Sequence, residues 1–202
     1  AGEVAKSGWR EHPRLIEDTY NVTDAVVVGT LLNSLLRHGD RVKIANQAQL
    51  VNVIAPIRSE ENGPAWRQTS FWPFERMARL AKGRILRLAV SAPQIETKRY
   101  GGVDAVDAAA TWDEETGRVV VFVANRSLDE ESDLTVELRG LTALRVVNAE
   151  TLTIPEGGDR HTSNLETTQD AVHMVPLAAA EVVDGAVRAT LPPLSWSVIE
   201  LA

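Results

Sequence analysis

The stretch KIANQAQLVNVIAPI, residues 43–57, decides how the chain is interpreted. It opens with apolar residues typical of a buried strand, which we expect over 42–46. It then places four carboxamides among Ala, Leu, Val and Ile, namely Asn46, Gln47, Gln49 and Asn52. A buried amide destabilises the fold unless its polar atoms find partners. The amides therefore either tie down the loop backbone or face a ligand, and the pattern alone favours neither.

The sequence on both sides of this stretch has helical periodicity. Apolar residues recur at helical spacing over 23–38, and Asn21 or Thr23 can act as the N-cap. A second helix is predicted over 71–82, where Gly83 stops it. Helix, buried strand, loop and helix in this order are the pieces of an α/β layer, although they cannot complete a sheet alone.

From residue 84 the hydrophobic period changes to two, which indicates short strands separated by turns. The clearest signal is a hairpin over 105–127, with its turn at 113–117. Further strands are expected over 84–93, 133–140, 144–150, 185–192 and 194–202. A polar excursion over 155–177 is a loop by composition. Many short antiparallel strands fit a β-sandwich of jelly-roll type.

The composition argues against several classes of function. A net charge of −7 and a pI near 5.2 disfavour nucleic-acid binding, which needs a basic face. Cys is absent, so there is no thiolate nucleophile or Cys-ligated metal, and this suits a reducing cytosol. No stretch approaches the roughly 18 apolar residues of a membrane span. The polar opening AGEVAKSGWREHPRLIED is typical of the middle of a longer protein.

Chemistry-bearing residues are sparse outside the amide stretch. The histidines lack the spacing of a metal site and are expected in caps or polar loops: His12, His38, His161 and His173. The pair Glu60 and Glu61 is expected to be solvated. Three aromatic residues at the start of the second helix fit packing better than sugar stacking, namely Trp66, Phe71 and Trp72.

Three segments carry a family resemblance. They read YNVTDAVVVGTLLNSLLRHGDRVKIANQAQLVNVIAPI, GPAWRQTSFWPFERMARLAKG and LPPLSWSVIELA. They resemble the C-terminal part of α-L-arabinofuranosidases of glycoside hydrolase family 51. The resemblance implies that residues 1–83 form the end of a (β/α)8 barrel, with a helix, strand eight and the final helix. Residues 84–202 would form the jelly-roll β-sandwich that follows.

The resemblance also implies where the catalytic groups lie. Members of this family are similar to other retaining glycosidases in using two Glu residues about 5 Å apart. Both precede the matched region, in motifs that this sequence lacks, so the chain alone is expected to be inactive. By this resemblance, Gln49 matches the Gln on barrel strand eight that hydrogen-bonds the arabinofuranosyl unit in the family. Asn46 matches a nearby position and is the weaker candidate. No catalytic residue, metal or cofactor is expected in this chain.

The partners expected from the resemblance are arabinofuranosyl-containing oligosaccharides from hemicellulose or pectin. The upstream catalytic part of the same enzyme is a further partner, in the same chain or as a second one. The full enzyme is expected to be a cytoplasmic homo-oligomer that binds neither nucleic acid nor membrane. If the α/β part lacks its covering layers, apolar side chains of helix 23–38 and strand 42–46 should be exposed.

The alternative is a non-catalytic β-sandwich module that binds carbohydrate or protein, with the helical part as a docking segment. This alternative predicts a cluster of exposed aromatic side chains on one face of the sandwich. Trp196 alternates with apolar residues, as a core residue does, and few other aromatic residues are available in the β part.

Overall fold

The computed structural model describes residues 17–202, which form two helices and thirteen strands. The helices are α1 (Val22–Arg37) and α2 (Phe71–Leu80). The strands are β1 (Ile57–Ser59), β2 (Ala65–Arg67), β3 (Arg84–Leu86), β4 (Gln94–Thr97), β5 (Gly101–Asp104), β6 (Val106–Trp112), β7 (Val119–Asn125), β8 (Ser132–Glu137), β9 (Val146–Leu152), β10 (Val175–Pro176), β11 (Glu181–Val183), β12 (Ala186–Leu191) and β13 (Ser195–Leu201).

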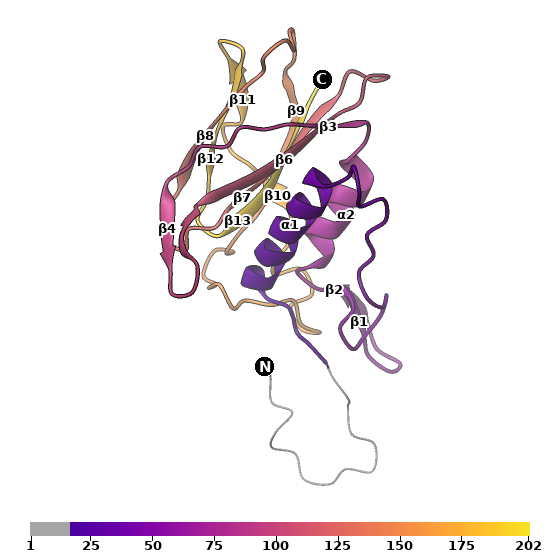
Figure 1. Ribbon diagram of the computed structural model, residues 1–202. Coiled ribbons are helices and arrows are strands. Elements are labelled where there is room, and N and C mark those ends of the chain that lie inside the picture. Colours follow the sequence, from indigo (N-terminus) through magenta and orange to yellow (C-terminus); the bar gives the residue numbers. More distant parts are fainter. Residues whose placement is uncertain (1–16) are drawn as a thin grey trace.

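Three layers make up the described part of the chain. The middle layer is a six-stranded antiparallel sheet in the order β10-β9-β13-β7-β6-β3. A three-stranded sheet, β11-β12-β8, covers one face of it, and α1 and α2 lie side by side on the other face (Figure 1). Two small hairpins, β1-β2 and β4-β5, stand apart from both sheets. The predicted β-sandwich is therefore present, with a helical layer added to it.

The central strands β7 and β13 are buried along their whole length because both faces of their sheet are covered. Phe122 and Trp196 point to the helical side, where their rings stack with centroids 5.9 Å apart. Val121 and Ile199 point to the opposite side and pack against the small sheet. The prediction that Trp196 is a core residue is confirmed, since its exposed fraction is 0%.

Helix α1 confirms the predicted helix and resolves its cap. Asn21 is the N-cap, and its side chain accepts a hydrogen bond from the Asp24 N–H at 3.1 Å. The Asp24 carboxylate in turn accepts one from the Asn21 N–H at 2.9 Å, which completes a capping box. Gly29 interrupts the apolar face because the indole of Trp196 packs directly on the helix backbone there. A Cβ at Gly29 would overlap that ring.

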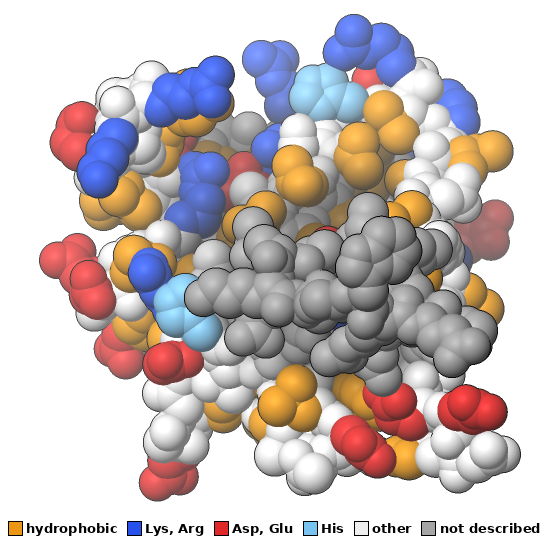
Figure 2. Space-filling view, turned by 90° about the horizontal axis from the view of Figure 1, so that it is seen from below, with side chains coloured by type: hydrophobic (Ala, Val, Ile, Leu, Met, Phe, Trp, Pro, Cys, Tyr) orange, Lys and Arg blue, Asp and Glu red, His pale blue; other side chains and the backbone are white. Residues whose placement is uncertain are grey.

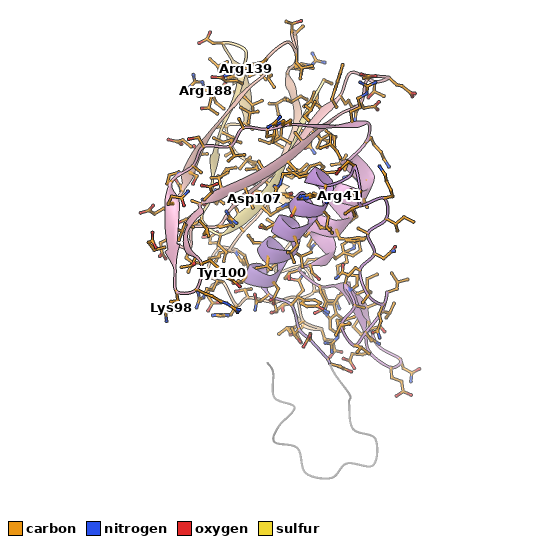
Figure 3. All side chains as sticks on the ribbon, viewed as in Figure 1. Arg41, Lys98, Tyr100, Asp107, Arg139 and Arg188 are labelled. Atoms are coloured by element: carbon orange, nitrogen blue, oxygen red, sulfur yellow. The ribbon has the colours of Figure 1, made fainter. Side chains whose placement is uncertain are left out.

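A polar contact fixes α1 on the sheet. Arg37 forms a salt bridge of 3.0 Å with Asp107 of β6, and Figure 3 shows Asp107 lying beside α1. The buried Asn33 donates to the same carboxylate at 3.1 Å and accepts from the Trp196 indole N–H at 3.4 Å. Because both partners of each contact are held by packing, these bonds set the register of α1 against β6.

The predicted strand over 42–46 is wrong, and so is the expectation of a barrel segment in this part of the chain. Residues 42–47 have no regular secondary structure, and every strand pair within residues 17–202 is antiparallel. A lone strand without neighbours has no partners for its backbone groups, so it does not persist as a strand. The boundary at residue 83 stays a prediction, although residues from both sides of it share one core cluster.

The β part follows the predicted pattern with local differences. The hairpin of β6 and β7 is confirmed, and β8, β9, β12 and β13 occupy the other predicted strands. Of the run 84–93 only β3 is a strand. The hairpin β4-β5 was not predicted, because its strands are polar and largely exposed.

Candidate functional site

The amide segment, defined here as residues 42–53, connects α1 to β1 along the outer side of the helices (Figure 1). Its four carboxamides divide into two kinds. Asn52 serves the loop itself, since it donates to the Ser59 hydroxyl at 3.2 Å and accepts from the Ser59 N–H at 2.8 Å. Gln47 is half-buried and donates to the Ser70 hydroxyl at 3.4 Å. Contacts within the chain therefore account for Asn52 in full and for the Nε2 of Gln47.

The two predicted ligand residues, Asn46 and Gln49, are both exposed. Neither side chain forms a hydrogen bond to any part of the chain between residues 17 and 202. Each amide therefore keeps both a donor and an acceptor available at the surface. Whether these groups bind a sugar stays a prediction.

The backbone of the segment departs from ordinary geometry after Gln47. Gln49 (φ +60°), Asn52 (φ +61°) and Val53 (φ +61°) all lie in the left-handed region. Asn tolerates this region, but a β-branched Val there is a genuine outlier, typically strained by about 1–3 kcal/mol. Backbone hydrogen bonds support the strained end, since Val53 O accepts from the Asp18 N–H at 2.9 Å. Such strain is commonly found beside functional sites.

An apolar groove with a volume of about 290 Å³ lies behind the first half of the segment, between α1 and α2. Its lining includes Leu32, Leu36, Val42, Ala45, Phe74 and Met77. Beside the groove, α1 exposes Val27 (51%), Leu31 (59%) and Leu35 (39%) at helical spacing, and Ile44 is 79% exposed. The expected exposure of apolar side chains is confirmed for both regions.

The aromatic residues around the start of α2 pack rather than bind. Trp66 and Trp72 are 7% and 9% exposed, and each indole N–H donates to a backbone carbonyl at 3.1 Å. The acceptors are the carbonyls of Asn164 and Val172, both in the polar excursion. Phe71 meets Trp72 edge to face, with centroids 5.5 Å apart. The two buried indoles are therefore unavailable for stacking on a sugar, and the half-buried Phe71 packs against one of them.

A buried polar cluster, not predicted from the sequence, joins the start of the described chain to the end of the amide segment. Gln68 is 0% exposed, accepts from the Tyr20 N–H at 3.0 Å and donates to the Ala55 carbonyl at 2.7 Å. The Tyr20 hydroxyl donates to the Ile54 carbonyl at 2.7 Å. Each partner is distant in sequence, so periodicity gives no signal for this cluster.

Charged groups border the same cluster. Arg58 is 8% exposed and forms a salt bridge of 2.7 Å with Glu17. Burial raises the pKa of Tyr20, and the nearby carboxylates of Asp18 and Asp24 raise it further. Tyr20 is therefore neutral near pH 7, and its hydroxyl donates the hydrogen bond that holds the Ile54 carbonyl, just after the amide segment.

Charged side chains of both signs surround the end of the molecule seen in Figure 2, interspersed with hydrophobic ones. No group of three or more acidic or histidine side chains in residues 17–202 could hold a metal ion. His38, His161 and His173 are exposed, and His12 lies outside the described residues. In that same part of the chain, no helix is both long and apolar enough to cross a membrane.

The exposed aromatic cluster that the alternative hypothesis requires is not found between residues 17 and 202. Among the exposed large hydrophobic side chains, Tyr100 is the single aromatic one, at 72% exposed. Figure 3 places it with Lys98 at the tip of the β4-β5 hairpin. One tyrosine on a hairpin tip is not a binding face.

Comparisons with known proteins agree with these observations. The family model described as the alpha-L-arabinofuranosidase C-terminal domain matches residues 3–195. An intracellular exo-alpha-(1->5)-L-arabinofuranosidase of Bifidobacterium longum is 43% identical over 95% of this chain and 34% of its own length. An exo-alpha-(1->6)-L-arabinofuranosidase of the same organism is 42% identical over 96% of this chain and 37% of its own length. The chain thus spans about a third of these curated relatives.

Solved structures show the same relationship. A family 51 alpha-L-arabinofuranosidase from Bifidobacterium longum superposes with a TM-score of 0.88 at 41% identity, covering 98% of this chain and 38% of that one. The family 51 arabinofuranosidase from Xanthomonas axonopodis pv. citri gives a TM-score of 0.83 at 26% identity, covering 93% and 37%. The chain therefore belongs to the alpha-L-arabinofuranosidase C-terminal domain family, the C-terminal part of glycoside hydrolase family 51 enzymes.

Proposed function

We propose that this chain acts as the C-terminal part of a retaining α-L-arabinofuranosidase. The complete enzyme would remove terminal α-L-arabinofuranosyl residues from arabinose-containing hemicellulose or pectin. Relatives named for (1->5) and (1->6) activity match equally closely, so the proposal names the class of substrate and not the linkage. Both catalytic glutamates would lie in the preceding part of the protein, and no cofactor is needed.

The observation that carries the proposal is the pair of exposed amides in the amide segment. Gln49 and Asn46 offer uncharged donors and acceptors, which suit the hydroxyl groups of a neutral sugar. We assign Gln49 the main role, which is to orient the sugar so that its anomeric carbon meets the nucleophile. Asn46 is the weaker candidate, at the near end of the same exposed stretch.

The exposed apolar stripe of α1 supports a contact with the catalytic part. Val27, Leu31 and Leu35 recur every four residues, so they lie on one face of the helix. About two thirds of the length of the relatives lies outside the matched region, which supplies a body large enough to cover this face. We assign the stripe to that preceding part. The enzyme is proposed to be a cytoplasmic homo-oligomer, and the isolated chain to be inactive.

The direct test is Gln49→Ala in the full-length protein, assayed with an aryl α-L-arabinofuranoside. Loss of a hydrogen bond that strengthens in the transition state should raise the activation free energy by about 2–3 kcal/mol, which lowers kcat/KM roughly 30–150-fold. Gln94→Ala is the matched control, since Gln94 is an exposed glutamine on β4. Equal kcat/KM values for the two variants would reject the role of Gln49.

The contact with the catalytic part is tested separately by Leu31→Asp. Leu31 is exposed in this chain, so the Tm of the isolated chain should not change. In the full-length protein the Asp would be buried against the catalytic part, so both the Tm and the activity should decrease. Leu128→Asp is the control, because Leu128 is a 46% exposed leucine in a loop of the sandwich. If Leu31→Asp leaves the full-length protein as stable as the control, the stripe is not covered by that part.

A further inference from the structure

We propose that Gln47 is a positioning residue that fixes the direction of Gln49 through its hydrogen bond to Ser70. This inference rests on the proposed function, because it names the residue that holds Gln49, the amide assigned to the sugar. It concerns a residue that is neither exposed like Gln49 nor satisfied within its own loop like Asn52.

The first observation is that Gln47 is the anchor of an otherwise untethered stretch. Within the described part of the chain, the side chains of residues 44–50 form a single hydrogen bond, from the Gln47 Nε2 to the Ser70 Oγ at 3.4 Å, and a parallel bridge between Val51 and Ile57 follows directly after them. Before this stretch, Val42 N–H still bonds the end of α1, and after it Asn52 N–H bonds the start of β1. The bond of Gln47 therefore holds the middle of the span.

The second observation is that the anchor point is rigid. Ser70 is 0% exposed and occupies the N-cap position of α2, yet its hydroxyl forms no capping bond. The hydroxyl is therefore available to Gln47. Helix α2 is itself held in the core by Trp72 and Met77, so Ser70 cannot follow movements of the segment.

The third observation is an unsatisfied atom. The Oε1 of Gln47 is buried and has no hydrogen-bond donor among residues 17–202. A buried amide oxygen without a donor is destabilising, and native proteins rarely leave one. The oxygen has no accessible surface, so no donor from outside the chain reaches it, and among residues 17–202 the amide is held by Ser70 alone.

The position of Gln47 in the chain gives these bonds a consequence for the site. Gln49 lies two residues further on with φ +60°, a backbone state that a non-glycine residue leaves readily when nothing holds it. If Ser70 holds the amide of Gln47, the backbone through Gln49 stays in place and the Gln49 side chain keeps one direction. Small displacements of an orienting group strongly reduce turnover.

The test compares variants of the full-length protein. Gln47→Leu keeps the approximate size of the side chain and removes the hydrogen bond to Ser70, and we expect kcat/KM to fall roughly tenfold. Ser70→Ala removes the anchor from the other side without altering the segment, and a loss of similar size is expected. Gln94→Ala on β4 is the control that should keep full activity.

The decisive readout is the double variant Gln47→Leu/Gln49→Ala. If Gln47 acts through Gln49, the double variant should be no slower than Gln49→Ala alone, because the pair is coupled. Losses that multiply would overturn the positioning role, and so would unchanged kcat/KM in both Gln47→Leu and Ser70→Ala. If Gln49→Ala itself is fully active, the failure lies in the proposed function of Gln49, and the positioning role falls with it.

Discussion

Asn164 offers the strongest test of how the fold is held together, because its side chain joins two parts of the polar excursion to each other and to β2. It is 1% exposed, and its Nδ2 donates to the carbonyls of Arg67 at 2.9 Å and Val172 at 2.8 Å. Its Oδ1 accepts from the Val172 N–H at 2.7 Å. The replacement Asn164→Ala removes all three bonds and leaves the backbone groups buried.

The expected cost follows from which groups lose their partner. Val172 N–H has no other acceptor, whereas the Val172 carbonyl keeps the indole N–H of Trp72 at 3.1 Å. Each stranded buried group costs about 1–3 kcal/mol, so we expect the free energy of unfolding to fall by roughly 3–4 kcal/mol. For a domain of this size that corresponds to a decrease in Tm of roughly 6–16 °C.

Thermal unfolding followed by circular dichroism measures the effect. The control is Gln169→Ala in the same excursion, which removes one exposed bond of 3.0 Å to the Glu166 carbonyl and should cost at most about 1 kcal/mol. Tryptophan fluorescence gives a second readout. The Trp66 indole donates to the Asn164 carbonyl, so the variant should expose this indole to solvent and shift its emission to longer wavelength. A Tm for Asn164→Ala equal to that of the control would refute the reasoning.

Three further predictions concern single positions. Gly83→Ala should destabilise the chain by at least about 2 kcal/mol, because the added methyl would overlap the Trp112 carbonyl oxygen; Gly117→Ala, with a similar φ and open space, should cost only about 1 kcal/mol. Equal urea midpoints for the two variants would contradict this. Gly29→Ala should also lower the urea midpoint, although Ala is the better helix former, because the methyl enters the indole ring packed on α1; a raised midpoint would show that the ring moves aside. The pKa of Asp113 is lowered, mainly by the hydrogen bond from its turn neighbour, so its contribution is present above the ordinary carboxyl pKa and is lost as the pH falls through the lowered value. The Tm difference between the native chain and Asp113→Asn should therefore be full at pH 6 and shrink progressively as the pH falls below the ordinary carboxyl pKa, and a difference that is independent of pH would refute the role of the carboxylate.

Local sequence signals predicted the elements whose stability is local or repeated. Helix α1 and the β6-β7 hairpin lie within one or two residues of their expected bounds, since caps, turn residues and apolar spacing are all visible in the sequence. The strand expected over 42–46 failed for the opposite reason. Its apolar residues fit a strand that is covered on both faces, but a strand also needs neighbours to pair with, and sequence spacing does not show whether they are present.

The candidate site shows the same division. Four amides in a polar interruption were visible, and the structure separates Asn52 and Gln47, which have internal partners, from Asn46 and Gln49, which have none within residues 17–202. The role of Gln68 could not be predicted, because its partners lie up to 48 residues away in sequence. Contacts of that kind form when the layers pack together, and they produce no periodic pattern in the sequence.

The place of β13 in the sheet has a consequence for biosynthesis. It is the last strand of this sequence, yet it lies between β7 and β9 and pairs with both along its whole length. Until the ribosome has released β13, the sheet exists as two halves with unpaired facing edges, the apolar β7 and the mixed β9. At about 5–20 residues per second, a nascent chain spends several seconds in that state and must be shielded from other chains. A truncation that removes β13 would leave this gap open permanently.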